Sequence, residues 1–273
     1  MIWESRQLKL LEYTRLDGRS NMDLDRALLA ACEAAPEFGF LRFYTWVAPA
    51  LSMGRLEPED AVDRTAAQRD GITIVRRPTG GRTVLHGDDL TYTVVVPRPE
   101  DAGLQETYNR LSEILVEGLS AIGASLDIER GKTGRSRMVQ KPCFASVSRY
   151  EVTHKGRKLV GSAQRIGERA VLQHGSIPLG RGYIDVVDYM NAPPAARERL
   201  RDEMRACTSC LEEVLGKHIE ARQVADALAA AFRRVFRCDR EPLAVESVYS
   251  LMPAEGEARV GGTHIPNPGY KSP

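Results

Sequence analysis

The sequence lacks any long apolar segment. No uninterrupted apolar run approaches the roughly 20 residues that a membrane-spanning helix requires. Residues 1–16 mix charged with apolar side chains and lack the unbroken apolar core of a secretion signal. These absences argue against a membrane protein and make the cytoplasm the expected location.

The chain also lacks a surplus of charge of either sign. It has 38 basic and 37 acidic residues, and its formal net charge is +1. Proteins that bind nucleic acid through their bulk charge are far more basic, so we expect no nucleic-acid partner. Local basic groups that could still steer small acidic proteins occur at Arg76, Arg77, Arg135 and Arg137.

Cysteine is scarce. The chain has five cysteines, an odd number that does not suggest a disulfide framework. Cys207 and Cys210 have C-x-x-C spacing, but no second pair is present to complete a zinc site. Ser209 followed by Glu212 instead matches a capping box and predicts the start of a helix. The sequence therefore predicts no metal site and no cofactor.

What is present suits a globular protein with a large core. The chain has 273 residues, 42% hydrophobic and 27% charged, enough for one large domain with a small helical addition. Several β-rich runs separated by glycine turns, with a few helical patterns between them, predict an α+β fold. We expect a catalytic domain over residues 10–240, with C-terminal helices from about residue 195. Residues 241–273 are rich in Gly and Pro and predict a loosely ordered tail.

Individual elements follow from local patterns. Asn21 can cap a helix whose apolar residues repeat at helical spacing. Further predicted helices cover residues 61–69, 108–122, 209–216 and 224–236, and predicted strands cover residues 41–46, 72–75, 91–96, 158–165 and 170–177. Residues 154–157 (HKGR) predict a hairpin turn.

The most informative stretch runs from Arg76 to Pro97 and reads RRPTGGRTVLHGDDLTYTVVVP. The β-branched runs at its two ends predict strands, and the residues between them form a glycine-bearing loop. The adjacent Gly80 and Gly81 let a backbone approach a ligand closely and direct its N–H groups inward. Arginines beside such a loop suit a phosphate or a carboxylate. The pattern fits a ligand-binding loop or an ordinary hairpin with a cationic rim.

Two neighbouring features also have two interpretations each. His86 is either a functional group, which donates toward a bound substrate or braces the loop, or an ordinary histidine hydrogen-bonded into a turn. Residues 130–141 (RGKTGRSRMVQK) are basic and glycine-bearing without periodicity. They fit a cationic collar around a pocket and a solvated surface turn equally well.

Acyl-transfer chemistry could arise where Cys143 and Lys158 meet. Fifteen residues separate them across a hairpin-rich segment, so the two side chains could lie together. A nearby ammonium favours the thiolate and lowers the pKa of the thiol. A thiolate exchanges acyl thioesters at little energetic cost, and backbone N–H groups of the glycine-bearing segments could stabilise the oxyanion. Taken singly, a cysteine is most often a buried small side chain and a lysine is usually a solvated surface charge, so neither residue carries this hypothesis unaided.

Residues 76–93 and 158–163 resemble two strings of a known family. The superfamily of lipoate–protein ligase A and the octanoyltransferases carries R-R-x-x-G-G-x-x-V-x-H…Y-[ST], matched here by RRPTGGRTVLHGDDLTYT, and K-x-x-G-S-A, matched by KLVGSA. The LipM-type octanoyltransferases are the most similar members. They carry a cysteine in a C-F-x-S setting, as Cys143 to Ser146 do here, and an arginine after the paired glycines, as Arg82 does.

The resemblance implies a fold, a reaction and a set of residues. The fold is the biotin/lipoate ligase-like catalytic domain, a mixed β-sheet packed by helices. Octanoyl passes from acyl carrier protein to Cys143, whose thiol pKa Lys158 lowers, and then to a lysine of a lipoyl domain such as the glycine cleavage H protein. The implied substrate-binding residues are Arg77, Gly80, Gly81, Arg82, His86, Tyr92, Ser146, Gly161, Ser162 and Ala163.

Two other functions fit parts of the pattern. An ATP-dependent lipoate ligase would use Lys158 to hold an acyl-adenylate and would leave Cys143 incidental. Such ligases usually show three consecutive glycines and His-Asp, whereas here Arg82 replaces the third glycine and Gly87 follows His86. A catalytically idle homologue would only bind lipoyl domains or carrier proteins. The presence of both Cys143 and Lys158 favours the octanoyltransferase.

Overall fold

The computed structural model describes residues 7–99, 104–129, 151–238, 241–249 and 251. Within these residues, seven strands form the main sheet, in the order β11-β12-β7-β3-β1-β13 with β2 paired to β3. Its strands are β1 (Gln7–Leu10), β2 (Thr14–Leu16), β3 (Phe38–Trp46), β7 (Asp89–Pro97), β11 (Gly161–Ile166), β12 (Ala170–Pro178) and β13 (Arg237–Cys238). Strand β1 pairs in parallel with β13 and β3, and β2 pairs in parallel with β3. Strands β3, β7, β12 and β11 pair antiparallel, each with the next. The sheet is mixed, as predicted.

Two three-stranded sheets accompany the main sheet in the described part of the chain. The first has the order β5-β4-β6 and consists of β4 (Ala50–Met53), β5 (Thr73–Arg76) and β6 (Val84–His86). The second has the order β10-β9-β8 and consists of β8 (Asp127–Ile128), β9 (Val152–His154) and β10 (Arg157–Lys158). Lys155 and Gly156 turn between β9 and β10 with φ of 49° and 74°, which confirms the predicted hairpin.

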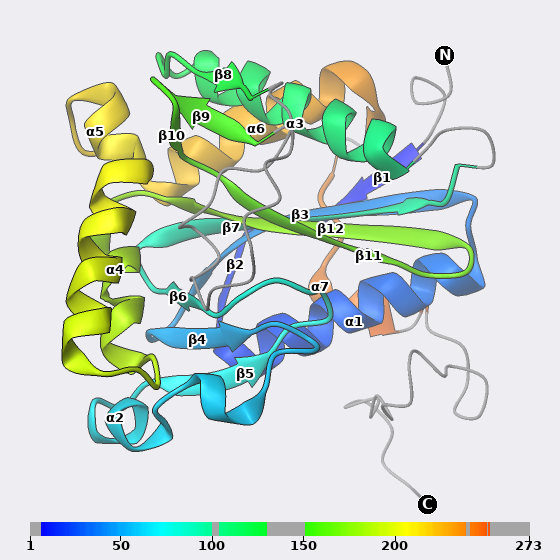
Figure 1. Ribbon diagram of the computed structural model, residues 1–273. Helices are drawn as coiled ribbons and strands as arrows, with labels where there is room; N and C mark the ends of the chain where they lie inside the picture. The colour runs from blue at the N-terminus through cyan, green and yellow to red at the C-terminus, as the bar shows by residue number, and fades with distance from the viewer. Residues whose placement is uncertain (1–6, 100–103, 130–150, 239–240, 250, 252–273) are drawn as a thin grey trace, which may run out of the picture.

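Helices cover both faces of the main sheet (Figure 1). Helices α3 (Leu104–Ser120) and α6 (Ala221–Val235) pack together on one face, next to the small sheet of β8, β9 and β10. Helix α1 (Gly18–Ala34) crosses the opposite face, with α7 (Val245–Tyr249) beside it. The remaining helices are η1 (Glu59–Ala61), α2 (Arg64–Arg69), η3 (Arg181–Tyr189), α4 (Pro194–Cys207) and α5 (Leu211–Leu215). This arrangement confirms the α+β class and the small C-terminal helical segment.

The two faces of the sheet follow from strand alternation, which β7 illustrates. Successive side chains of a strand point to opposite faces. Val94 and Val96 lie in the apolar cluster that contains α3 and α6, whereas Val95 packs with Leu24 and Leu28 of α1. The main core therefore lies between the sheet and the α3–α6 pair, and a smaller one lies under α1.

Two predicted helix caps are wrong. Helix α1 is capped by Asp17, whose carboxylate accepts the N–H groups of Arg19 and Ser20 at 2.9 and 3.1 Å. Asn21 lies inside the helix, and its amide donates to the Leu16 carbonyl at 3.1 Å. Helix α5 is capped by Cys210 without a side-chain hydrogen bond, not by the predicted Ser209 capping box. In α1, Asp17 takes the N-cap position predicted for Asn21. In α5, Cys210 takes the position predicted for Ser209.

The predicted tail is described only in part. Leu243 N–H donates to the Leu10 carbonyl at 2.7 Å, and Val248 of α7 is buried against the α1 cluster. The domain boundaries at residues 10–240 stay a prediction. No helix in the described ranges is long and apolar enough to cross a membrane.

Candidate active site

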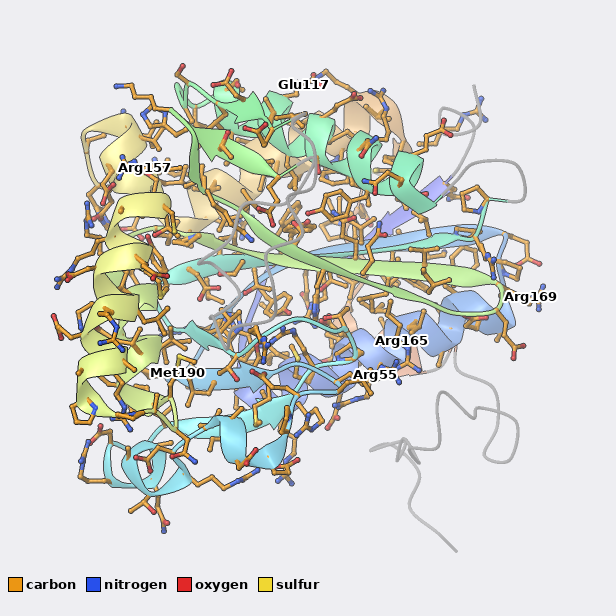
Figure 2. The ribbon with its side chains drawn as sticks, in the orientation of Figure 1. Arg55, Glu117, Arg157, Arg165, Arg169 and Met190 are labelled. Carbon is orange, nitrogen blue, oxygen red and sulfur yellow. The ribbon has the colours of Figure 1, made fainter. Side chains whose placement is uncertain are left out.

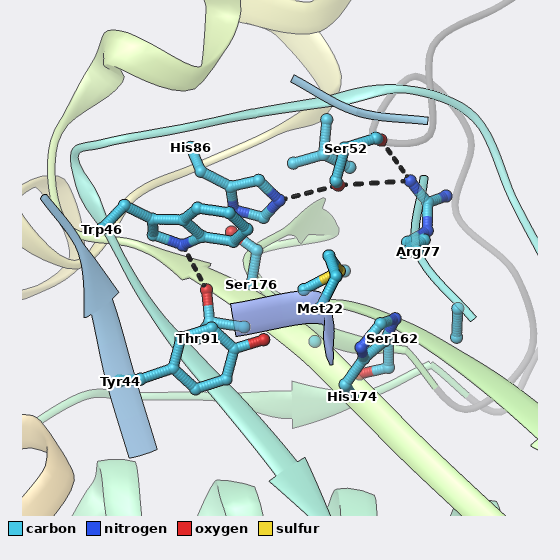
Figure 3. A pocket seen from close by; sticks show the side chains of 14 residues that line it. Met22, Tyr44, Trp46, Ser52, Arg77, His86, Thr91, Ser162, His174 and Ser176 are labelled. Carbon is cyan, nitrogen blue, oxygen red and sulfur yellow. Dashed lines mark hydrogen bonds between the residues drawn. The ribbon is translucent and has the colours of Figure 1, made fainter. Parts of the chain in front are cut away.

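A pocket lies between α1, the strands β3, β11 and β12, and the small sheet that carries β4 and β6 (Figure 3). It is open to solvent, and its roughly 380 Å³ of atom-free space includes part of that open solvent. The described residues that line it are Met22, Tyr44, Trp46, Ser52, Arg77, Val84, His86, Thr91, Gly161, Ser162, Ala163, His174, Gly175 and Ser176. Met22, Tyr44, Trp46 and Val84 give it an apolar wall that suits a hydrocarbon chain.

The first polar group of the wall, here called the His86 array, consists of Asp89, His86 and Ser52. His86 Nδ1–H donates to Asp89 at 2.8 Å, and His86 Nε2 lies 2.8 Å from Ser52 Oγ. Ser52 Oγ also accepts from Arg77 at 3.4 Å, so its own hydrogen is assigned to His86 Nε2. Trp46 stacks on the His86 ring, with centroids 4.0 Å apart. The two hydrogen bonds and the stacked indole therefore hold the His86 ring in one orientation.

Burial alone would raise the pKa of the Asp89 carboxyl. The His86 ring and the hydroxyl of Ser176, which donates at 2.7 Å, outweigh this effect and hold the pKa below its ordinary value. The N–H of Gly87 and the hydroxyl of Thr91 donate to the same carboxylate, each at 3.0 Å. Asp89 is therefore a buried carboxylate with four hydrogen-bond donors.

The second polar group, here called the His174 array, consists of Asp25, His174 and Thr79. His174 Nδ1–H donates to Asp25 at 2.9 Å, and His174 Nε2 lies 2.6 Å from Thr79 Oγ1. Burial lowers the pKa of His174 even though Asp25 acts to raise it, so the ring is neutral and Thr79 donates to it. The array joins α1, β12 and the glycine-bearing loop.

Asp25 is also the centre of a buried charge network. It pairs with Arg42 at 3.2 Å, and both side chains are at most 1% exposed. Thr93 donates to it at 2.8 Å and Tyr44 at 3.2 Å. Burial raises the pKa of Asp25, but the His174 hydrogen bond and the Arg42 charge outweigh burial and leave the pKa lowered.

Arg77 lies in the pocket wall, but its guanidinium donates hydrogen bonds to other groups of the protein. Nη1 donates to the carbonyl and the hydroxyl of Ser52 at 2.5 and 3.4 Å. Nε and Nη2 donate to Gly80 O at 3.1 and 2.8 Å, and Nη2 also donates to Arg82 O at 2.7 Å. These contacts use all five N–H groups of the side chain. Arg77 therefore braces the loop, which its pattern alone does not reveal.

The paired glycines of the loop, Gly80 and Gly81, are not among the described residues that line this pocket. Gly81 has φ of 91°, and its carbonyl lies 1.9 Å from where a Cβ on Gly54 would be, so both positions require glycine. Arg82 lines a second cavity instead, beside Glu57 and Arg199. Gly80, Gly81 and Arg82 are therefore not among the described residues that line the pocket with His86.

Strand β11 places the end of the KLVGSA string in the pocket wall. Gly161, Ser162 and Ala163 all line it. Tyr92 is fully buried on the α3–α6 face of the sheet, and its hydroxyl lies 2.7 Å from Ser162 Oγ. Burial raises the pKa of Tyr92 to about 12. Tyr92 supports β11 from behind, outside the described lining.

Lys158 lies three residues before this wall, in β10. Its ammonium is 2.6 Å from Glu151, and the two side chains are 2% and 4% exposed. Such a pair fixes the lysine head group in one place. Lys158 does not belong to the described lining of the pocket. Cys143 and Ser146, like Arg135 and Arg137, lie outside the described residues.

A cationic rim continues the same edge of the sheet. Arg165 follows Ala163 on one face of β11, and Arg55 lies close to it in Figure 2. Burial lowers the pKa of Arg165, and the charges of Arg55 and Arg26 lower it further. Arg76, predicted as a steering charge, instead donates to the carbonyls of Gly54, Arg55 and Glu57.

No metal centre is formed by the residues that the structure describes. No three His, Cys, Asp or Glu side chains among them gather as a metal ion would require. Neither Cys207 nor Cys210 forms a disulfide, and burial raises the pKa of the Cys210 thiol.

The sequence patterns missed Asp25, Asp89, Ser52 and Thr79. Asp25 carries one signal, because a charged residue stands among the apolar positions of a predicted helix. Asp89 lies three residues after His86, a spacing that places an acid beside the ring. Ser52 and Thr79 carry none, since a hydroxyl in a strand or turn is ordinary.

Comparisons with known proteins identify one family. A model of the lipoyl protein ligase A/B catalytic domain matches residues 17–233. Octanoyltransferase LipM of Moorella thermoacetica is 38% identical, over 86% of this chain and 88% of its own. The LipM protein of Symbiobacterium thermophilum is 36% identical, over 83% and 85% of the two chains. A bipartite lipoate protein ligase of Thermoplasma acidophilum shares the fold, with a TM-score of 0.70 at 20% identity over 90% of each chain.

Proposed function

Because the chain belongs to the lipoyl protein ligase A/B catalytic-domain family, we propose that it is an octanoyltransferase of protein lipoylation. The observation that carries this proposal is the similarity to proteins named octanoyltransferase LipM, at 38% and 36% identity over most of both chains. The pocket supports it, since its apolar wall of Met22, Tyr44, Trp46 and Val84 suits a short acyl chain.

The proposed reaction has two transfers. The Cys143 thiolate attacks the octanoyl thioester of acyl carrier protein, and the carrier thiolate leaves. The ε-amine of an acceptor lysine then attacks the new thioester, loses a proton, and releases the Cys143 thiolate. Lys158 stabilises the thiolate by its charge, and Glu151 keeps the ammonium in place at 2.6 Å.

The acceptor in this proposal is a lipoyl domain, such as the glycine cleavage H protein. Carrier and lipoyl domains tend to be small and acidic, and the rim of Arg55 and Arg165 offers complementary charge beside the pocket. In this proposal the rim adds to the steering that the sequence predicts for Arg135 and Arg137, whereas Arg76 and Arg77 are bonded to backbone carbonyls.

Intact-mass spectrometry after incubation with octanoyl-acyl carrier protein, without ATP, tests the proposal. We expect a gain of one octanoyl group that hydroxylamine reverses and that Cys143→Ala abolishes. Cys207→Ala is the matched control and should still be acylated. Amide formation that requires ATP and free acid, with no adduct, would instead assign the protein to the ATP-dependent ligases.

A further inference from the structure

The backbone of Lys158 is bonded to the junction between α4 and α5. Ser209 N–H donates to the Lys158 carbonyl at 2.8 Å, and Thr208 forms an isolated parallel bridge with Lys158. The junction is buried, since Thr208 and Ser209 are at most 1% exposed. Strand β10 has only two residues, and this junction supports it on the side away from β9. The C-terminal helical segment therefore helps to fix where the Lys158 side chain begins.

A side-chain cluster joins β10 to the same helical segment a second time. Arg157 Nη1 donates to Glu213 of α5 at 2.9 Å and to the Thr208 carbonyl at 3.2 Å. The hydroxyl of Ser209 donates to the same oxygen of Glu213 at 3.3 Å, and Arg181 pairs with the other oxygen. Glu213 thus collects one group from β10, one from the junction and one from η3.

The place of the Lys158 ammonium matters because its charge is already balanced. The head group lies 2.6 Å from Glu151, so the two together present no net charge to a neighbouring thiol. What such a pair can still offer a thiolate is an N–H donor and a local dipole. Both weaken steeply with distance and misalignment. A small displacement of β10 would therefore change how well Lys158 stabilises a thiolate.

Resting on the proposed function, in which Lys158 stabilises the Cys143 thiolate, we propose that Glu213 is a positioning residue for acyl transfer. It acts through Arg157 and the junction, and it does not belong to the described lining of the pocket. Its pair with Arg157 is partly exposed and contributes little to stability. The helices that follow the catalytic sheet are thereby part of the apparatus that sets the reactivity of the cysteine.

One substitution separates position from charge by the sign of its effect. Glu213→Gln removes a negative charge, which by electrostatics alone would favour the Cys143 thiolate and speed its alkylation. If Glu213 holds β10, the same change displaces Lys158 and slows the reaction. We expect iodoacetamide to alkylate Cys143 about threefold more slowly at pH 7, followed by peptide mass spectrometry, with the pH profile shifted upward. A rate equal to that of the wild type, or faster, would overturn the proposal.

The adjacent carboxyl of α5 provides the matched control. Glu212 accepts from the exposed His218 at 2.6 Å and has no side-chain bond to β10 among the described residues. Glu212→Gln should therefore alkylate at the wild-type rate. Slowing equal to that of Glu213→Gln would overturn the proposal, because it would assign the effect to α5 in general.

A second variant tests the link from its other end. Arg157→Lys keeps the charge but loses the planar fork that contacts both Glu213 and the Thr208 carbonyl, so Cys143 should again react more slowly. In both variants kcat for octanoyl transfer should fall while KM for the acyl donor stays unchanged, since the pocket is untouched. Wild-type rates in a folded Arg157→Lys protein would overturn the proposal even if Glu213→Gln does not fold. A wild-type Cys143 that alkylates no faster than a model thiol would overturn the proposed function as well.

Discussion

The two faces of the main sheet differ in kind although they belong to the same strands. In β7, Val94 and Val96 pack into the apolar cluster under α3 and α6. Thr91 and Thr93, on the other face, donate to Asp89 and Asp25. One face is mostly apolar, and the other is built around two buried carboxylates.

This difference separates stability from function. Apolar burial contributes roughly 25 cal/mol for each Å² removed from water and requires no precise partner. A buried charge network costs desolvation and is weak evidence for stability. The pocket lies on the polar face. We expect substitutions on this face to cost more stability per atom removed than substitutions on the apolar face.

The largest expected effect comes from the centre of the polar face. Asp25→Ala leaves the Arg42 charge buried and unpaired and should lower the free energy of unfolding by about 3–5 kcal/mol. Urea denaturation measures it. Asp23→Ala removes a half-exposed pair with Arg26 in the same helix and should cost at most about 1 kcal/mol. Equal losses in the two variants would contradict the comparison.

The apolar face should respond in stability alone. Leu115 in α3 is fully buried, and Leu115→Ala should lower the free energy of unfolding by about 3 kcal/mol. Octanoyl transfer should keep its wild-type kcat/KM at a temperature where the variant is folded. A lowered kcat/KM would show that the two faces are coupled.

A smaller effect is expected where the polar face holds the glycine-bearing loop. Thr79→Val keeps the shape and removes the hydroxyl that donates to His174, so it should cost about 1 kcal/mol of stability. Octanoyl transfer should lose more in kcat/KM than this loss of stability explains, because the loop is no longer fixed. Thr79→Ser restores the hydroxyl and should recover the transfer rate. Equal rates for the Val and Ser variants would refute the anchoring role.

The sequence predicted the sheet more completely than the site, for physical reasons. Alternating and β-branched runs such as residues 91–96 are local signals, so β7 and β12 were found where they were expected. The two sequence strings, residues 76–93 and 158–163, identified His86 and Gly161 because the pattern of a strand or loop depends on residues that are neighbours in the sequence. Asp25 and His174 are 149 residues apart, and no local pattern joins them.

Arg77 shows the opposite limit. Its place beside two glycines suggested an anion ligand, but only the folded loop reveals that its N–H groups are directed at Ser52, Gly80 and Arg82. Whether a guanidinium binds a ligand or the backbone depends on which acceptors the fold places around it. Substrate binding by Arg77 stays a prediction, and the geometry favours a bracing role.

The smallest effect distinguishes two histidines by the sign of their pH dependence. Burial lowers the pKa of His174, so below about pH 6.5 the unfolded chain binds a proton that the folded protein refuses. The stability contributed by neutral His174 is therefore lost as the pH falls. The hydrogen bond to Glu212 raises the pKa of the exposed His218, whose contribution is present at low pH and is lost as the pH rises through the raised pKa.

Urea denaturation between pH 7.5 and 5.5 measures both contributions. His174→Gln should make the fall in stability toward pH 5.5 shallower than in the wild type, because the proton uptake of the unfolded state at this position is removed. His218→Gln should make the same fall slightly steeper, since a group that gains stability in acid is lost. The polar face then accounts for part of the acid sensitivity, and the surface pair opposes it. Slopes that move in the same direction in the two variants would refute the neutral state assigned to His174.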